Sequence, residues 1–318
     1  MSEQKRERFQ ILSLDGGGIK GLFSVALLAK LEEDHGCDIT EHFDLIVGTS
    51  TGGIIALALG AGMRPREIVE FYLSNGQEIF HNLFGLSSAK HWFCRKFSQK
   101  SLRKALQKCF GDKRLADSKK RLVITSYNLG EDDIYLFKTP HHERLRRDYK
   151  IPMWKVALAT SAAPTYFPIF TGLDSIRLID GGVWANNPTM VGIIEAMSLL
   201  EVPSRLISVF NVGTSDVVSK HRKWLNWGGK LVWAKSALAV NLIMRGQNLG
   251  VHKQAVHLLG DDRVRRLDPK VPDGLLSMDR MTPNELLSKA AHESRNFSPE
   301  FKKVFMPHIA PSYEPTYK

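Results

Sequence analysis

The chain has 318 residues, of which 43% are apolar and 24% charged, and its formal net charge is +11. This length and apolar fraction suffice for a sizeable buried core. The three cysteines are odd in number and lack metal-ligand spacing, which argues against a disulfide framework and against a metal site.

The first predicted elements are a strand over residues 9–14 and a helix over residues 21–31, joined by a glycine-rich turn. The residues before them are polar and charged, so we expect no secretory signal and a cytoplasmic protein. The turn reads Asp15-Gly16-Gly17-Gly18-Ile19-Lys20-Gly21. Glycines at such a junction leave backbone N–H groups uncovered at a helix N-terminus, where an anion is favoured.

The second predicted strand, residues 43–47, leads into a Gly-x-Ser-x-Gly turn and an apolar helix over residues 53–60. The turn reads Gly48-Thr49-Ser50-Thr51-Gly52. Such an elbow exposes the serine oxygen at the tip of a strand, and small neighbours allow the tight turn. The alternative for a lone pentapeptide of this kind is a serine or threonine helix cap. The uncharged run of residues 45–63 is interpreted as this buried strand and helix, not as a membrane span.

A second interpretation of the glycine turn is a dinucleotide fingerprint, because Gly16, Gly18 and Gly21 have the required spacing. That fingerprint needs an acidic residue at the end of the second strand. Here Asp44 opens the strand and Ser50 follows its end. A nicotinamide or flavin site is therefore disfavoured.

A basic insertion at about residues 85–120 follows, and residues 88–121 contain twelve Lys or Arg against two Asp. Aromatic residues are interleaved, and the position suits an active-site lid or an interfacial helix. Basic charges near an anionic lipid surface contribute roughly 1 kcal/mol each, although a solvated basic face is the ordinary alternative. No helix-turn-helix, zinc or RNA-binding motif is present, so we expect no nucleic acid polymer as partner. The residues expected to contact a membrane or a nucleotide are Lys90, Trp92, Arg95, Lys96, Arg147, Arg222 and Trp224.

Further strands are predicted at residues 121–128, 133–138, 176–179 and 205–211. The strand at 176–179 ends in Asp180-Gly181-Gly182, which places a carboxylate at a strand tip, unless this is an ordinary Asp-Gly turn. A serine nucleophile needs a base, which is either this aspartate acting directly or a histidine of a triad. The histidines considered are His221, His252, His257, His292 and His308.

In this order and with these spacings, the three motifs resemble the patatin-like phospholipase family. Residues 159–168 and 180–188 are also similar to family segments, and the resemblance covers roughly residues 9–213. It implies that Ser50 is the nucleophile, that Asp180 is its partner, and that the backbone of Gly16, Gly17 and Gly18 forms the oxyanion hole. No catalytic histidine, metal or other cofactor is implied.

The alternation of strands and helices predicts an α/β fold with a mainly parallel central sheet and helices on both faces. The resemblance makes this the three-layer patatin fold with appended helices. We expect a catalytic core at residues 9–213 and a C-terminal helical extension at residues 214–318 packed on the core. Within the extension, a helix is predicted over residues 226–244.

The function expected from the resemblance is phospholipid acyl hydrolysis. Bacterial members of similar length and opening motif include phospholipases that a cyclic dinucleotide switches on to degrade the host membrane in anti-phage defence. A cyclic dinucleotide activator, assembly into a homo-oligomer and a peripheral position at the inner membrane are therefore hypotheses for this chain. The alternatives are a catalytically silent cyclic-nucleotide-binding scaffold, another serine acyl hydrolase such as a thioesterase or neutral lipase, and an NAD-type oxidoreductase.

Overall fold

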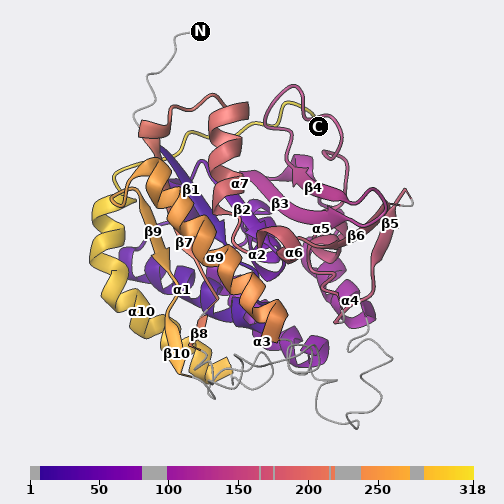
Figure 1. Cartoon of the computed structure of the whole chain (residues 1–318), viewed down its shortest axis with the longest axis horizontal. Helices are drawn as coiled ribbons and strands as arrows, with labels where there is room; N and C mark the ends of the chain where they lie inside the picture. The colour runs from indigo at the N-terminus through magenta and orange to yellow at the C-terminus, as the bar shows by residue number, and fades with distance from the viewer. Residues whose placement is uncertain are drawn as a thin grey trace.

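The computed structural model describes residues 8–80, 99–164, 166–174, 176–214, 216–218, 238–272 and 283–318. Within these residues the centre is an eight-stranded sheet in the order β5-β6-β3-β2-β1-β7-β9, and β4 pairs with β3 beside this path (Figure 1). Its strands are β1 (Phe9–Leu14), β2 (Leu45–Thr49), β3 (Arg121–Asn128), β4 (Asp133–Lys138), β5 (Phe170–Leu173), β6 (Ile176–Asp180), β7 (Ile207–Val212) and β9 (Val264–Leu267). A separate two-stranded ribbon consists of β8 (Asp216–Val218) and β10 (Lys270–Pro272).

Helices cover both faces of the sheet, as expected for a three-layer fold. The longer helices are α1 (Gly21–His35), α2 (Thr51–Gly60), α3 (Pro65–Phe80), α4 (Gln99–Phe110), α5 (Met153–Thr160), α9 (Leu238–Leu259) and α10 (Pro283–Val304). The shorter ones are α6 (Gly182–Ala185), α7 (Thr189–Ile194) and the π-helical turn η6 (Glu195–Leu199). Short 3₁₀ turns are η1 (Gly18–Lys20), η2 (Ile39–His42), η5 (Leu115–Asp117) and η7 (Ser204–Leu206).

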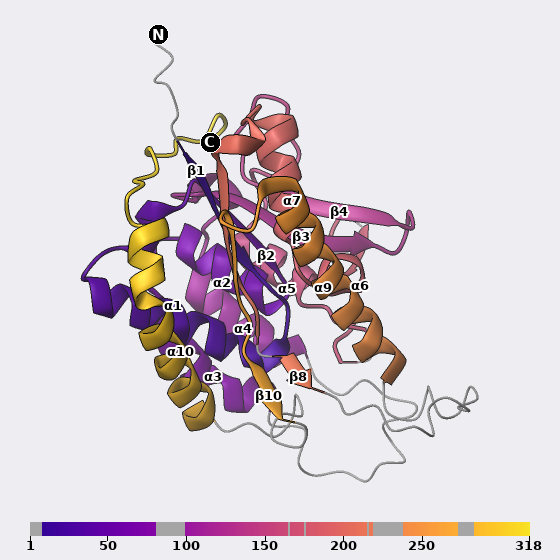
Figure 2. The same cartoon turned by 60° about the vertical axis from the view of Figure 1, so that its left-hand side comes forward.

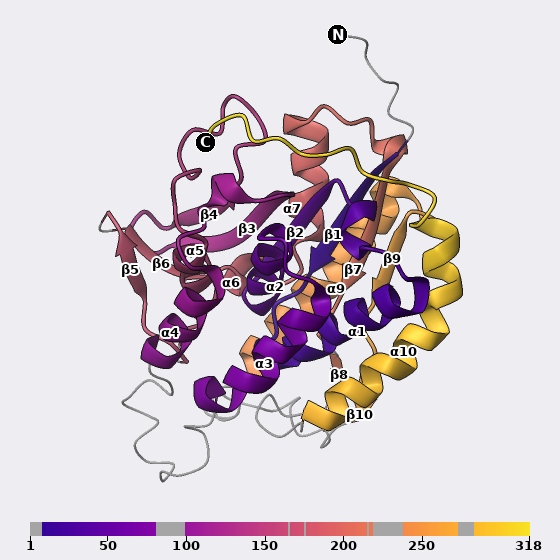
Figure 3. The ribbon, with the colours of Figure 1, turned by 180° about the vertical axis from the view of Figure 1, so that it is seen from behind.

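The core has two parts because successive side chains of a strand point to opposite faces. Leu12 and Leu14 of β1 pack with α1, α2, α3, α4, α5 and α10, the layer seen from behind in Figure 3. Phe9 and Ile11 pack with α7, η6 and α9 on the other face. The uncharged run of residues 45–63 is the buried strand β2 followed by the buried helix α2. No helix of the described residues is long and apolar enough to cross a membrane.

The pairing of β3 with its three neighbours positions the site. β2 runs parallel to residues 121–125 of β3, whereas β6 runs antiparallel to residues 126–128. β4 pairs with residues 123–128 of β3, a range that includes residues already paired with β2 and with β6. β4 must therefore lie along the opposite edge of β3. The carboxyl ends of β2 and β6 therefore meet on one edge, with Thr49 opposite Thr125 and Asp180 opposite Ser126.

The sequence predicted most of the sheet to within two residues of its observed strand ends, but it missed β5 and β9. β9 pairs in parallel with β7, with Val209 opposite Val264. The residues beyond 213, expected to form a helical extension, thus also add a strand to the main sheet. The helix predicted over residues 226–244 falls partly outside the described residues, and α9 is described from Leu238 to Leu259.

Candidate active site

Ser50 occupies the sharp turn between β2 and α2 with φ 54° and ψ −121°. A non-glycine residue rarely adopts this backbone conformation, which costs roughly 1–3 kcal/mol and persists only where neighbours enforce it. The enforcing contact is Thr160, whose hydroxyl accepts the Ser50 N–H at 2.9 Å and donates to the Thr125 carbonyl at 2.7 Å. The predicted elbow is therefore present, and it is fixed to both β3 and α5.

The small residues of the elbow are required by close backbone contacts. A Cβ atom on Gly52 would lie 2.2 Å from the Leu14 carbonyl oxygen at the end of β1. A Cβ atom on Gly48 would lie 2.4 Å from the Gly52 carbonyl oxygen. Such distances are far below van der Waals contact, so any larger residue would move Ser50.

Asp180 ends β6 and lies beside Ser50. Its N–H donates to the Ala162 carbonyl at 3.1 Å, and its Oδ1 accepts the Gly182 N–H at 2.7 Å. The side chain is 5% exposed and lies close enough to the Ser50 side chain for that group to influence its pKa. Burial raises the pKa of Asp180 to about 6, against the lowering effect of the Ser50 and Gly182 hydrogen bonds. This carboxylate therefore has a proton affinity suited to a general base near neutral pH.

A histidine base finds no support in this geometry. In the described part of the chain, no histidine is hydrogen-bonded to Ser50 or Asp180. His308 instead contacts Asp44 at 2.7 Å, and His292 contacts Asn296 at 3.2 Å. His221 lies outside the described residues. Asp44 precedes β2, and its carboxylate binds His308 and the Gln10 N–H. It is therefore not placed at the end of β2, where a dinucleotide site needs its acidic residue.

The glycine loop between β1 and η1 lies against the elbow. A Cβ atom on Gly16 would be 3.4 Å from the Ser50 Cβ. The Gly16 N–H donates to the Asn186 carbonyl at 2.9 Å and is thereby occupied. Within the described residues, the amides of Gly17 and Gly18 have no hydrogen-bond acceptor. Gly18 has a φ of 60°, a left-handed conformation that glycine adopts without strain.

A buried ion network that the sequence did not reveal supports this loop from behind. Arg266 of β9 binds Asp15 at 2.8 Å and Asp268 at 2.6 Å, with its side chain 8% exposed and that of Asp15 1% exposed. Burial raises the pKa of Asp15 to about 6, while Arg266 opposes that shift. Asn211 of β7 also donates to Asp15 at 2.7 Å, and Thr214 donates to the Gly16 carbonyl at 3.0 Å. No motif marked Arg266, because it lies on a strand that the sequence analysis missed.

Asparagines at the start of α7 form a second support. The side chain of Asn186 donates to Asn248 of α9 at 3.1 Å, and that of Asn187 donates to Asn211 at 3.2 Å. Thr189 donates to the Ser13 hydroxyl at 2.9 Å. The segment of residues 180–188 therefore links Asp180 to the glycine loop.

The residues expected to contact a membrane or nucleotide are mostly not described. Lys90, Trp92, Arg95, Lys96, Arg222 and Trp224 lie outside the described residues. The described end of the basic insertion is α4, which buries Leu102, Ala105, Leu106 and Phe110 against the core. Arg147 binds Asp148 at 2.7 Å, donates to the Leu136 carbonyl at 2.8 Å and lies over the Tyr135 ring. Among described residues, no cluster of three or more His, Cys, Asp or Glu is placed to hold a metal ion.

Replacing Arg266 tests the network behind the glycine loop. Arg266→Met leaves the Asp15 carboxylate buried without its cation, and we expect unfolding free energy to fall by about 3–5 kcal/mol. Adding Asp15→Asn to Arg266→Met should recover much of this loss, because the uncompensated charge is then absent. Urea denaturation measures both. Arg263→Met is the control, since Arg263 is more exposed and approaches Asp262 only at 4.0 Å. Equal small losses for Arg266→Met and Arg263→Met would contradict the network.

Comparison with known proteins agrees with this geometry. Residues 12–193 match the family model of patatin-like phospholipases. A cGAMP-activated phospholipase of Vibrio cholerae is 32% identical, and the alignment covers 95% of this chain and 94% of the relative. Another from Pseudomonas aeruginosa is 30% identical, with coverage of 90% and 88%. The crystal structure of VipD from Legionella pneumophila shares the fold at a TM-score of 0.50 and 10% identity, covering 97% of this chain and 68% of VipD. The chain therefore belongs to the patatin-like phospholipase family of serine acyl hydrolases.

Proposed function

We propose that this chain hydrolyses acyl esters of phospholipids with Ser50 and Asp180 as its catalytic dyad, under the control of a cyclic dinucleotide. The observation that supports the dyad is the position of the buried Asp180 at the end of β6, beside the strained Ser50 elbow, where the Ser50 side chain lowers the pKa of this carboxyl. The Ser50 N–H donates to the hydroxyl of Thr160, the last residue of α5. The Asp180 N–H donates to the carbonyl of Ala162, just after α5. The nucleophile and base are thus held together before substrate binds.

The reaction follows from these positions. The Ser50 oxygen attacks the ester carbonyl carbon while Asp180 accepts the hydroxyl proton. The tetrahedral intermediate collapses, its C–O bond to the glycerol oxygen breaks, and Asp180 returns the proton to that oxygen. The lysophospholipid then leaves, and water, deprotonated by Asp180, attacks the acyl-enzyme. Fatty acid is released and the Ser50 hydroxyl is restored.

Negative charge on the carbonyl oxygen is stabilised by backbone amides of the glycine loop in this proposal. Gly17 and Gly18 are the two donors, because the Gly16 amide is bound to Asn186. Removing one such donor from an enzyme typically slows it by 10²–10³. The Asp15–Arg266 pair anchors the start of this loop.

A lipid substrate is supported by apolar side chains exposed near the dyad. Val183 of α6 follows Asp180 closely in the chain and is 41% exposed. α9 passes beside α6, where Gln247 donates to the Val183 carbonyl at 3.3 Å (Figure 2). Leu242 and Ile243, on the first half of α9, are also exposed, and α9 contains no Asp or Glu. We propose that this face, defined by Val183, Leu242 and Ile243, lies on the membrane surface during hydrolysis, with the enzyme bound peripherally.

Activation by a cyclic dinucleotide is proposed from the relatives. Two proteins named cGAMP-activated phospholipases align with nearly the whole chain, including the part beyond the matched family domain. Hydrolysis of the host membrane on such a signal would serve anti-phage defence. The alternatives are a scaffold without catalysis and a thioesterase. The next experiment distinguishes both from a phospholipase.

Fatty-acid release from mixed phospholipid vesicles tests the proposal. With 3′,3′-cGAMP present, the wild type should release fatty acid, and Ser50→Ala should reduce the rate by about 10³-fold or more, since no nucleophile remains. Ser204→Ala, distant in the chain from all three motifs, is the control and should keep the wild-type rate. Release that survives Ser50→Ala, or no release from the wild type under any condition, would count against the proposed function.

The pH dependence of the reaction should report Asp180. Because burial raises its pKa to about 6, the carboxyl is protonated and inactive as a base below that pH. We expect kcat/KM on a soluble p-nitrophenyl ester to fall about tenfold per pH unit below pH 6 and to level off above pH 7. Circular dichroism over the same range confirms that the protein stays folded. A profile that is flat down to pH 4.5 would exclude Asp180 as the base.

The face formed by Val183, Leu242 and Ile243 can be tested separately from the chemistry. Leu242→Ser combined with Ile243→Ser removes two apolar side chains whose burial in lipid contributes roughly 1.5–3 kcal/mol each. We expect hydrolysis of anionic vesicles to fall tenfold or more while hydrolysis of the soluble ester is unchanged. The control is Leu258→Ser with Ile309→Ser, which removes two equally exposed apolar side chains elsewhere. Equal effects of both pairs on vesicles would rule out this face.

A further inference from the structure

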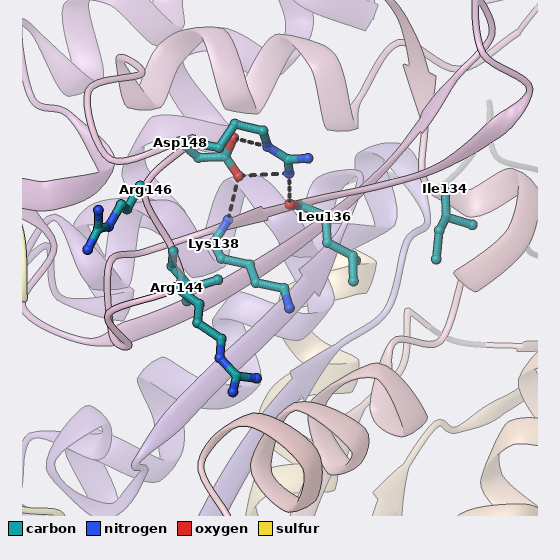
Figure 4. Close-up of a pocket in the computed structure, with 8 residues that line it drawn as sticks. Ile134, Leu136, Lys138, Arg144, Arg146 and Asp148 are labelled. Atoms are coloured by element: carbon teal, nitrogen blue, oxygen red, sulfur yellow. Dashed lines mark hydrogen bonds and ion pairs between the residues drawn. The ribbon is translucent and has the colours of Figure 1, made fainter.

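A basic hollow lies at the edge strand β4 (Figure 4), and its lining includes neither Ser50 nor Asp180. Its volume is about 370 Å³, and it is formed by the outer face of β4 and the loop of residues 144–148. The residues lining it are Ile134, Leu136, Lys138, Arg144, Leu145, Arg146, Arg147 and Asp148. Four of these carry positive charge and one carries negative charge.

Two of the four cations are already neutralised. Arg147 binds both carboxylate oxygens of Asp148, at 2.7 and 3.1 Å. The Asp148 carboxylate also accepts hydrogen bonds from the Tyr135 hydroxyl at 3.2 Å and from the Lys138 backbone N–H at 3.2 Å. The Lys138 ammonium donates to Glu195 of η6 at 2.5 Å. Among the described residues, no carboxylate pairs with Arg144 or Arg146.

Arg144 and Arg146 are exposed and present their guanidinium groups to solvent. Within the described residues, the Arg144 side chain has no hydrogen-bond acceptor or carboxylate partner. Arg146 is oriented through its Nε, which donates to the Tyr317 hydroxyl at 2.9 Å and to the Glu143 carbonyl at 3.2 Å. Its guanidinium also lies over the Tyr317 ring, 5.4 Å from the centroid. One arginine is thus held in place and the other is free to close on a ligand.

We propose that this hollow binds a phosphodiester, with Arg144 and Arg146 receiving the phosphate oxygens. Guanidinium groups bind phosphate through paired, charge-assisted hydrogen bonds. The apolar wall of Ile134 and Leu136 suits the face of a base or sugar beside the phosphate, and Ile134 is 48% exposed. Resting on the proposed function, we assign the cyclic dinucleotide activator to this site. The volume accommodates one nucleotide unit, so the other half of the ligand remains outside.

The position of the hollow connects it physically to the glycine loop. Lys138 lines the hollow and binds Glu195, the first residue of the π-turn that continues α7. The other end of α7 follows Asn186, whose carbonyl accepts the Gly16 N–H at 2.9 Å. A phosphate that attracts Lys138 weakens its bond to Glu195 and acts on the same helix that anchors the loop. The ligand therefore reaches the oxyanion donors through α7.

Calorimetric binding of 3′,3′-cGAMP tests the site without relying on catalysis. Arg144→Ala with Arg146→Ala should weaken binding at least tenfold, and Arg144→Glu alone should weaken it by a similar factor. The single variant matters because the Arg144 side chain makes no hydrogen bond or ion pair with the described residues, so we expect its replacement to leave folding intact. Lys302→Ala with Lys303→Ala on α10 is the control, since it removes the same charge from an exposed surface elsewhere. This control should change the affinity less than twofold.

Two further measurements identify the phosphate source. Co-sedimentation with phosphatidylglycerol vesicles shows whether Arg144→Glu loses lipid headgroup binding, and competition by inorganic phosphate shows whether a bare anion suffices. We expect vesicle binding to persist and inorganic phosphate to compete only weakly. Unchanged cGAMP affinity in the pocket variants overturns the assignment, whether or not vesicle binding falls.

Activity then separates this inference from the proposed function. The pocket variants should hydrolyse the soluble ester at the wild-type rate and lose only the stimulation by 3′,3′-cGAMP. If Ser50-dependent hydrolysis is absent from the wild type, the proposed function fails while the binding result still stands. If hydrolysis occurs and the pocket variants remain fully stimulated, the site is wrong and the enzyme is retained.

Discussion

The meeting of two strand ends on one edge of β3 is the constraint on which this active site depends. β2 arrives parallel and β6 antiparallel, so their carboxyl ends face each other where Thr125 and Ser126 are neighbours. No loop has to close between Ser50 and Asp180, because the hydrogen-bonded sheet sets their separation. A site built on strands is held more precisely than one on loops. The Gly182 N–H further fixes the Asp180 carboxylate by donating to its Oδ1 at 2.7 Å.

The glycine loop depends on contacts of another kind. It lies between β1 and α1, and its supports come from residues far apart in the chain: Asn186 before α7, Thr214 after β7, and Arg266 on β9. The buried pair Asp15–Arg266 joins the first strand to a strand near the C-terminal end. The last hundred residues therefore help to hold the glycine loop, since they provide the cation that pairs with Asp15.

The sequence predicted the parts of this site that depend on local turns, and it missed those that depend on contacts between residues far apart in the chain. Ser50, Asp180 and the glycines lie in short motifs whose local turns need particular residues, such as Gly52 against the Leu14 carbonyl. The layered fold and the strands β1 to β4 were confirmed, whereas the catalytic roles of Ser50, Asp180 and the glycines stay predictions. Arg266 and β9 were missed because a four-residue strand with two arginines carries no apolar alternation. The hydrogen bond from the Gly16 N–H to the Asn186 carbonyl could not be predicted either, because it is a tertiary contact between distant residues.

Burial of the two carboxyl groups has a thermodynamic consequence for the whole protein. Asp15 and Asp180 both have a pKa raised to about 6, above that of an unfolded aspartate. Between about pH 4 and pH 6 the folded state therefore holds protons that the unfolded state has released. Their contribution to folding is most favourable at the acidic end of this window and is lost as the pH rises through 6. At neutral pH both buried carboxyl groups are thus ionised at the expense of the stability of the fold.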